Sequence, residues 1–369
     1  MRYHHTTPWN NTIAFCILFD VRNLELKKTQ FPLLHFAEHL MFVETQHLDG
    51  NSLRVQKNLL FEALEAYTSF DFLDITVVCS RGDLAQVCST LKEMIFTWQC
   101  NEIQFQKVKE DIITEIKDAK ELLVHKSMAS LKDLALEEID LIVNVTGDEK
   151  TIHALTFSEL QEITHVWQTM LKYAPRSLLV AGPTLAEAEI NMLDEVLEMK
   201  HHTQSIPLRS PIPFGSRYFR RTETHAVVIN TAFSSLFFLL FQRLYSIRHM
   251  NLNTDWEFSF ARDTNHLFYL ASATDDKPLD DSAVEKFFLR KPTNEEFLLI
   301  QRLLVQELDT LNDGIYPKEI IGWMDIFQVR NIPETQKKTF SEIQDMFRVI
   351  PYLDFLHQWK KVFGHFKKK

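Results

Sequence analysis

Residues 34–42 read LHFAEHLMF and contain His35, Glu38 and His39 in the pattern H-x-x-E-H. Positions four apart lie above one another on the same face of a helix, so both histidines can point a ring nitrogen at one ion. A catalytic zinc ion needs such a pair, together with a third protein ligand and an open position. The order of the three residues is that of the inverted zincins. Two histidines on the polar flank of an ordinary helix would give the same letters, so the pattern alone leaves both interpretations open.

A carboxylate further along the chain is a candidate for the third ligand. The helix expected over residues 102–123 has one apolar stripe, formed by Phe105, Val108, Ile112, Ile116 and Ala119. At about 100° per residue, Glu115 lies about 60° from the centre of this stripe, whereas Glu110 points almost to the opposite side. Glu115 can therefore face inward, although the helical wheel by itself favours a solvated position for it.

Composition limits the classes of partner. The 369 residues are enough for two domains of ordinary size, and 45% hydrophobic with 24% charged residues is the composition of a soluble globular protein. The formal net charge of −10 is spread along the chain. This distribution disfavours nucleic acid or an anionic membrane as the main partner.

Membrane spans and secretory signals are not expected. No apolar run reaches the roughly 18–20 residues that a membrane span needs, and residues 1–11 lack the basic and then apolar order of a secretory signal. The cysteines have no C-x-x-C spacing and are predicted to be buried, reduced thiols. They are Cys16, Cys79, Cys88 and Cys100. Together these features predict a cytoplasmic protein.

Strand and helix patterns alternate along the chain. In the first half, apolar and β-branched runs predict strands at 12–21, 70–79 and 176–183. Helical periodicity predicts helices at 31–44, 51–65, 84–98, 102–123, 156–171 and 186–199. The helix at 51–65 is expected to be capped by Asn51 or Ser52. The second half has strand patterns at 224–230, 256–261 and 266–273 and helix patterns at 234–247 and 294–312.

The segment 201–217 has three prolines, a glycine and no periodicity, which favours a domain boundary. We predict an N-terminal domain at 1–200, a linker at 201–217 and a C-terminal domain at 218–369. The order of the elements indicates an α+β fold, in which each domain is a mostly antiparallel sheet covered by helices.

The sequence resembles the insulinase/pitrilysin family of zinc peptidases, and most of all its half-size branch, which includes the mitochondrial processing peptidase and bacterial relatives. In that family a glutamate ligand follows the H-x-x-E-H helix at a spacing that this sequence reproduces, since 75 residues lie between His39 and Glu115. Residues 64–95 are similar to the family's N-A-x-T strand, turn and helix, and LTFSELQEI and YAPRSLLVAGP are similar to the end of its first domain. The resemblance is specific over about residues 10–200 and weak beyond.

The resemblance implies two similar domains that form half of a clamshell, with one zinc ion per chain. It implies His35, His39 and Glu115 as the zinc ligands. It also implies Glu38 as the general base that takes a proton from the attacking water.

Further residues are implied to hold the substrate. An extended peptide would add to the edge of one strand through main-chain hydrogen bonds. The residues of that strand are Ala66, Tyr67, Thr68 and Ser69. In the second domain the family uses an arginine and, seven residues on, a tyrosine. In this chain the residue seven positions after Arg248 is Asp255, and Trp256 follows it. Arg248 and Trp256 are therefore the candidates for holding the substrate in the second domain.

Two departures from the family's pattern concern the first domain. Seven residues before Glu115, where the family has a second glutamate, this chain has Val108. A carboxylate that orients a metal ligand can contribute about 10–100-fold to affinity or activity, so weaker zinc binding or slower turnover is expected. Where the family has an asparagine before A-x-T, this chain has Glu65. Compared with the family's first domain, the sequence begins closer to the first predicted strand, as if one edge strand were missing.

From these features we predict a zinc endopeptidase that cleaves short or unfolded peptides. Maturation of a small precursor, such as a leader or bacteriocin-type peptide, is the task that analogy suggests. Half-size members enclose the substrate between two subunits, so a related partner is expected, in a heterodimer or a homodimer. The rival interpretation is a non-catalytic, peptide-binding subunit that completes the chamber of an active partner. Val108 and the altered second domain favour the rival, whereas the complete metal site favours the enzyme.

Overall fold

The computed structural model describes residues 2–8, 11–21, 31–68, 72–121, 149–196, 217–221, 224–230, 235–250, 256–262, 266–273, 281–312, 317–326 and 338–363. These residues form two compact units. The first holds the described residues up to Asp118, those of 149–196 and those of 317–325. The second holds residues 119–121 and the described parts of 208–312 and 326–369. Apart from Arg217, the predicted linker lies outside the described residues. None of the helices described is both long enough and apolar enough to cross a membrane.

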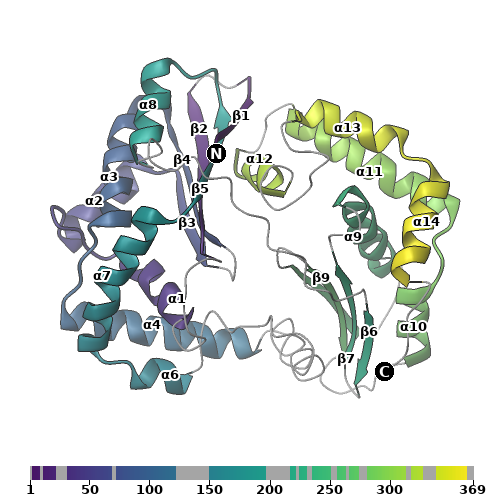
Figure 1. The fold of residues 1–369 in the computed structure, drawn as a ribbon, viewed down its shortest axis with the longest axis horizontal. Coiled ribbons are helices and arrows are strands. Elements are labelled where there is room, and N and C mark those ends of the chain that lie inside the picture. Colours follow the sequence, from purple (N-terminus) through teal and green to yellow (C-terminus); the bar gives the residue numbers. More distant parts are fainter. Residues whose placement is uncertain are drawn as a thin grey trace. The chain divides into compact units, whose positions relative to one another are not determined.

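The first unit is built on a five-stranded sheet with the order β1-β5-β2-β4-β3 (Figure 1). Its strands are β1 (Arg2–Thr6), β2 (Thr12–Asp20), β3 (Ala63–Thr68), β4 (Phe72–Ser80) and β5 (Arg176–Gly182). β1 runs parallel to β5, whereas the pairs β2–β4, β2–β5 and β3–β4 are antiparallel. The predicted, mostly antiparallel sheet is thus confirmed, and β3 lies at one edge of it.

Helices cover both faces of this sheet. They are α1 (Phe31–Leu40), α2 (Gly50–Leu60), α3 (Leu84–Phe96), α4 (Glu102–Glu121), α6 (Glu149–Ala154), α7 (Phe157–Tyr173), α8 (Glu187–Val196) and α12 (Pro317–Met324). α12 packs on β2, β4 and β5, whereas α1, α3 and α7 lie on the other side of the sheet (Figure 1). β2 is therefore buried along almost its whole length, which explains why its sequence is apolar without alternation.

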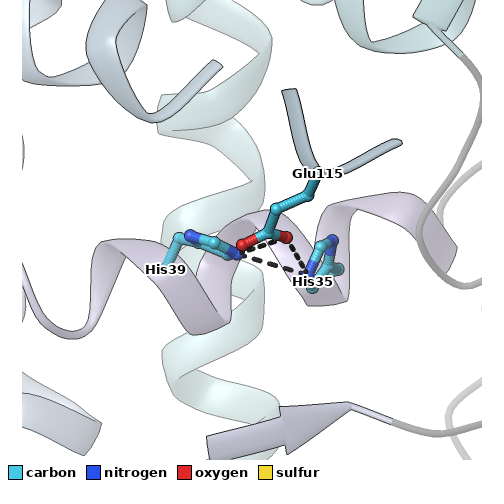
Figure 2. Close-up of side chains that lie close together, drawn as sticks. All are labelled: His35, His39 and Glu115. Atoms are coloured by element: carbon cyan, nitrogen blue, oxygen red, sulfur yellow. Dashed lines mark hydrogen bonds and ion pairs between the residues drawn. The ribbon is translucent and has the colours of Figure 1, made fainter. Parts of the chain in front are cut away.

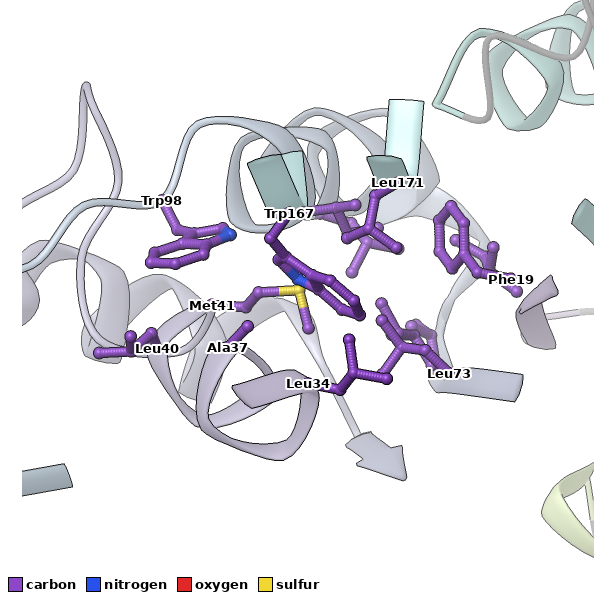
Figure 3. Close-up of a cluster of buried hydrophobic side chains, with 14 of the residues drawn as sticks. Phe19, Leu34, Ala37, Leu40, Met41, Leu73, Trp98, Trp167 and Leu171 are labelled. Carbon is purple, nitrogen blue, oxygen red and sulfur yellow. The ribbon is translucent and has the colours of Figure 1, made fainter. Parts of the chain in front are cut away.

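The apolar core holds the helix that carries the two histidines (Figure 3). Met41 lies between Trp98 and Trp167, and Leu34 of α1 lies close to Trp167. Both indoles are almost fully buried, at 1% and 2% exposure. Truncation of a buried tryptophan costs roughly 3–5 kcal/mol. These contacts therefore position α1 firmly against α7.

The region between α2 and β3 differs from the predicted helix at 51–65. α2 begins after Asp49, whose carboxylate accepts hydrogen bonds from the backbone N–H groups of Asn51 and Ser52 at 3.0 and 2.8 Å. The prediction of Asn51 or Ser52 as the cap is therefore wrong, because the acid just upstream supplies the acceptor. The predicted helix also runs into β3, whose alanines, leucine and glutamate favour helices locally but pair with β4.

Two further features differ from the expectations. β1 is a strand at the edge of the sheet, where the short polar sequence RYHHT predicts none. α12 belongs to the first unit, although the sequence-based division places it in the C-terminal domain. Its apolar residues Ile320, Ile321 and Met324 are buried, and the sequence alone does not show which sheet covers them.

The second unit contains a four-stranded antiparallel sheet in the order β6-β7-β9-β8. Its strands are β6 (Arg217–Arg221), β7 (Thr224–Asn230), β8 (Trp256–Arg262) and β9 (His266–Ala273). Its helices are α9 (Ser235–Met250), α10 (Asp281–Leu289), α11 (Asn294–Asn312), α13 (Phe340–Val349) and α14 (Tyr352–Phe363). α11 packs against α9, α13 and α14. Both units thus combine antiparallel strands with helices, so the predicted α+β class is confirmed.

Candidate functional site

Two helices of the first unit bring two histidines and a glutamate together (Figure 2). His35 and His39 lie one turn apart on α1, and Glu115 comes from α4. The Nε2 atoms of the two histidines are 3.2 Å apart. Glu115 Oε2 lies 3.4 Å from each of them. Within the described ranges, these residues are the one group of histidines, cysteines and acids with the spacing of a metal site.

The spacing of the three atoms fits a tetrahedral zinc ion. Zinc binds imidazole nitrogen and carboxylate oxygen at about 2.0–2.2 Å, so two ligands of a tetrahedral ion are about 3.3–3.5 Å apart. Charge-assisted hydrogen bonds between imidazole and carboxylate are shorter, about 2.7–2.9 Å. The two distances of 3.4 Å therefore match the edges of a metal coordination shell better than they match hydrogen bonds.

Burial keeps His35 in the form that can bind a metal. Its side chain is 11% exposed. Desolvation, and then the neighbouring His39, lower the pKa of His35 from 6.5 to about 4. The imidazole is therefore neutral at pH 7 and keeps the lone pair that a metal ligand needs.

The other ring nitrogen of His35 has no orienting partner among the described residues. Its Nδ1 atom is buried and has no hydrogen-bond partner in the part of the chain that the structure describes. A metal-bound histidine usually donates this N–H to a carboxylate or carbonyl that fixes the ring. Val108, at the position where the resemblance calls for a second glutamate, is 5% exposed and packs in the apolar core.

Glu38 lies on the same helix as the histidines but contacts the edge of the sheet. Its Oε2 accepts a hydrogen bond of 2.5 Å from the hydroxyl of Thr68, at the end of β3. Burial raises the pKa of Glu38, and Glu115 adds to this effect. The hydrogen bonds from Thr68 and the charge of His39 lower the pKa, but the net shift is upward. A carboxylate with a raised pKa beside a candidate metal site is suited to act as a general base.

β3 carries the predicted peptide-binding residues at the edge of the sheet. No described strand pairs with its outer side, so its main chain can accept an added strand. Ala66 and Thr68 face the core, whereas Glu65 and Tyr67 are exposed and face the other way. Tyr67 is 65% exposed. Ser69 lies outside the described residues.

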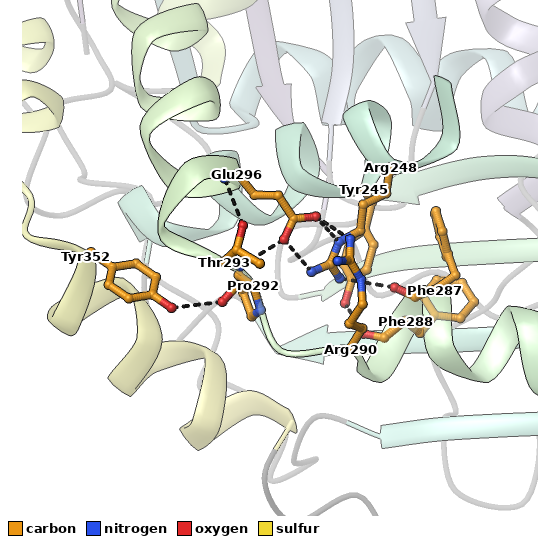
Figure 4. Close-up of polar contacts among 9 residues, drawn as sticks. All are labelled: Tyr245, Arg248, Phe287, Phe288, Arg290, Pro292, Thr293, Glu296 and Tyr352. Carbon is orange, nitrogen blue, oxygen red and sulfur yellow. Dashed lines mark hydrogen bonds and ion pairs between the residues drawn. The ribbon is translucent and has the colours of Figure 1, made fainter. Parts of the chain in front are cut away.

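The predicted substrate-binding residues of the second domain lie in the second unit, where Arg248 is buried on α9 (Figure 4). Its Nε and Nη2 atoms donate to the two carboxylate oxygens of Glu296 at 2.9 and 3.1 Å. Its Nη1 atom donates to the carbonyl of Phe287 at 3.1 Å. Each guanidinium nitrogen thus has an acceptor within the unit, as in a structural ion pair. Trp256 is the first residue of β8, and Asp255 lies outside the described residues.

The sequence does not reveal two of these contacts. Thr68 is predicted to bind the peptide through its main chain, and its hydrogen bond to Glu38 is not anticipated. The signal that would indicate it is a threonine on the core-facing side of the edge strand, in a chain that has a glutamate on the apolar helix upstream. The pairing of Arg248 with Glu296 has no such signal, because 48 positions separate the two residues.

Comparisons with known sequences give one distant relative. No family model matches the chain. Subunit 1 of the mitochondrial cytochrome b-c1 complex of Bos taurus is 23% identical over 198 residues, which are 51% of this chain and 40% of the bovine protein. The match therefore spans less than half of that relative's length.

Solved peptidase structures are similar over almost the whole chain. The periplasmic protease PqqL of Escherichia coli gives a TM-score of 0.67 at 16% identity, over 98% of this chain and 44% of PqqL. A protease from Helicobacter pylori gives 0.69 at 13% identity, over 98% and 94% of the two chains. An inactive domain of an M16 peptidase from Pseudomonas fluorescens gives 0.67 at 11% identity, over 98% and 91%. Identities this low show a shared fold and no more. The chain has the fold of the M16 peptidases, which is the insulinase/pitrilysin fold.

Proposed function

We propose that the chain is a zinc-dependent endopeptidase that cleaves short or unfolded peptides. The observation that carries this proposal is the triangle of His35 Nε2, His39 Nε2 and Glu115 Oε2, whose edges of 3.2, 3.4 and 3.4 Å suit a tetrahedral zinc ion. These residues would hold one zinc ion per chain and leave a fourth position for the reactants. The similarity to solved proteases supports a function of this kind.

Glu38 has the central role in the proposed reaction. Zinc, when bound, supplies a Lewis acid that polarises the scissile carbonyl and makes water a better nucleophile. Glu38 accepts the proton of the attacking water and can then pass it to the nitrogen of the leaving amine. Its raised pKa suits both steps, because the same group must take the proton and release it again.

The edge of β3 is the proposed place for the peptide. An extended peptide would add to the sheet through main-chain hydrogen bonds, with little selection among side chains. The hydrogen bond between Thr68 and Glu38 joins this edge to the base, so a peptide bound there would lie beside the reacting groups. Short or unfolded peptides have main chains that are free to pair in this way, which supports substrates of this kind.

A related half-size subunit is the proposed partner, in a heterodimer or a homodimer. The chain covers 44% of PqqL, so a second chain of similar length would complete an assembly of that size. Arg248 is engaged with Glu296, which favours a partner that provides the donor to the attacked carbonyl. Loss of one such donor typically costs about 10²–10³-fold. Activity should therefore rise on addition of the partner and saturate near one to one.

A second candidate function is a non-catalytic subunit that binds peptides along β3 and completes an active partner's chamber. The engaged guanidinium of Arg248 and the lack of a described acceptor for His35 Nδ1 favour it. The inactive M16 domain from Pseudomonas fluorescens also has this fold.

Metal content and cleavage together test the proposal. The purified chain should contain one zinc ion by elemental analysis and cleave an unstructured peptide, alone or with a related subunit. His39→Ala should lose both properties. Glu110→Gln, which changes an exposed acid of the same α4 helix that carries Glu115, is the matched control and should keep both. Stoichiometric zinc in the His39→Ala protein would refute the site, and zinc without cleavage in every mixture would favour the second candidate.

A further inference from the structure

Thr68 connects the edge strand of the sheet with the buried acid of the metal site. It is the last residue of β3, it is 7% exposed, and its hydroxyl donates a 2.5 Å hydrogen bond to Glu38 Oε2. Glu38 is itself 9% exposed. In the described part of the chain, no other side chain donates a hydrogen bond to this carboxylate.

This hydrogen bond restrains the orientation of the Glu38 carboxylate. The hydroxyl of Thr68 engages Oε2, the backbone of Thr68 adds a second hydrogen bond to the same carboxylate, and the remaining lone pairs can accept a proton. A buried carboxylate that turned away from this donor would lose a charge-assisted hydrogen bond and remain desolvated, which is costly. The bond therefore restrains the carboxylate in one orientation.

We propose that Thr68 is a positioning residue that couples the binding of a peptide along β3 to the orientation of Glu38. The inference rests on the function proposed above, because it takes Glu38 as the base. A peptide strand added to β3 bonds to the main chain of the strand that carries Thr68. Those bonds restrain the threonine and its hydroxyl, so the base is held best when the substrate is in place. Displacement of a reacting group by about 1 Å can cost about 10²-fold in rate.

Replacement of the hydroxyl at nearly constant shape tests the inference. Thr68→Val should lower kcat for an unstructured peptide about 10–100-fold. KM should stay almost unchanged, because the main chain of β3 is kept. Thr68→Ser keeps the hydroxyl and should restore most of the wild-type kcat. Each variant should retain one zinc ion per chain, because Thr68 is not a ligand.

Thr90→Val is the matched control. Thr90 on α3 is 5% exposed, and its hydroxyl donates a 2.9 Å hydrogen bond to Gln56 Oε1. This variant loses a comparable bond outside the site and should keep the wild-type kcat. An equal loss of kcat in both valine variants, an unchanged kcat in Thr68→Val, or a higher KM at constant kcat would each overturn the inference.

Thermal unfolding of the metal-free protein gives a readout that does not depend on activity. Thr68→Val should lower Tm in the wild-type background and lower it less in the Glu38→Leu background, because the two side chains share one bond. Additive shifts would overturn the contact itself. A wild-type chain that binds zinc but cleaves no peptide in any assembly would refute the proposed function together with this inference. Wild-type cleavage with an unaffected Thr68→Val protein would refute the inference alone.

Discussion

Two polar clusters of the molecule balance their charges in different ways. In the second unit, Arg248 forms an ion pair with Glu296, and each guanidinium nitrogen of Arg248 donates a hydrogen bond to a protein acceptor. In the first unit, His35, His39 and Glu115 turn three electron-pair donors toward one point. A guanidinium–carboxylate pair is complete in itself, whereas converging imidazoles and a carboxylate make a site for a cation.

This difference allows structural and functional roles to be separated by experiment. Loss of the complete ion pair should affect the stability of the second unit and leave zinc binding unchanged. Loss of a converging ligand should affect zinc binding and leave the metal-free fold largely unchanged. A change that disturbed both properties equally would contradict the distinction.

The largest effect is expected for Glu38→Gln, which leaves both clusters intact. The amide can still accept a hydrogen bond from Thr68, but it cannot take a proton from water. Peptide cleavage at saturating substrate should therefore fall by about 10²–10⁴-fold, with zinc content unchanged. A wild-type rate in this variant would make Glu38 a bystander, and if that rate were seen only with a related subunit present, it would favour the non-catalytic subunit.

The ion pair of Arg248 should respond to Arg248→Met with a loss of about 3 kcal/mol in the free energy of unfolding, because Glu296, whose side chain is 16% exposed, then remains largely desolvated without its main partner. The side chain of Arg248 is 4% exposed. Arg290→Met is the matched control, since Arg290 also contacts Glu296 but is 52% exposed. It should cost at most about 1 kcal/mol in denaturant unfolding. Weaker peptide binding at unchanged stability in Arg248→Met would instead support the predicted substrate-holding role.

Acid should act on the two clusters over different pH ranges. The pKa of His35 in the folded chain, about 4, lies below the ordinary 6.5, so the unfolded chain takes up this proton first. The metal-free protein should therefore lose about 3 kcal/mol as pH falls from 6.5 to about 4. Burial raises the pKa of Glu296, but Arg248, the Thr293 N–H and Arg290 together hold it below 4.5. Its contribution is present above pH 4.5 and is lost only as pH falls further.

Unfolding of the chelator-treated protein, followed against pH, measures both contributions. His35→Gln should remove the part of the loss between pH 6.5 and 4 that His35 causes. The part that comes from His4 and His5, whose pKa values burial also lowers, should remain, as should the loss at lower pH. Identical pH profiles for the variant and the wild type over the upper range would show that His35 does not take up its proton in this way.

The sequence points to the residues of the candidate metal site, but it does not predict how they come together. Helical periodicity places Glu115 on the flank of its own helix, and in the structure it is 53% exposed and still lies 3.4 Å from both histidines. Periodicity describes one helix at a time. The approach of α4 to α1 depends on the packing of the whole unit, and here the family-like spacing between His39 and Glu115 supplies that information.

Partners from distant segments were not predicted for the same reason. Thr68 and Glu38 are 30 positions apart, and no local pattern links an edge strand to that acid. Local preference also misleads at the end of α2, where residues that favour helices belong to β3 because β4 pairs with them.

The smallest loss in the free energy of unfolding is expected when an exposed ion pair is removed. This pair sharpens the comparison because it differs from the Arg248–Glu296 pair mainly in its solvent exposure. Lys318 of α12 and Glu65 of β3 are 2.5 Å apart, with side chains 56% and 55% exposed. Water solvates both charges, so Lys318→Met should cost less than about 1 kcal/mol. α12 is held instead by apolar burial, and Ile320→Ala, at a side chain with 0% exposure, should cost about 2–5 kcal/mol. If denaturant unfolding gave equal losses for the two variants, the ion pair would hold α12 on the sheet, and burial would not decide how much a charge contributes.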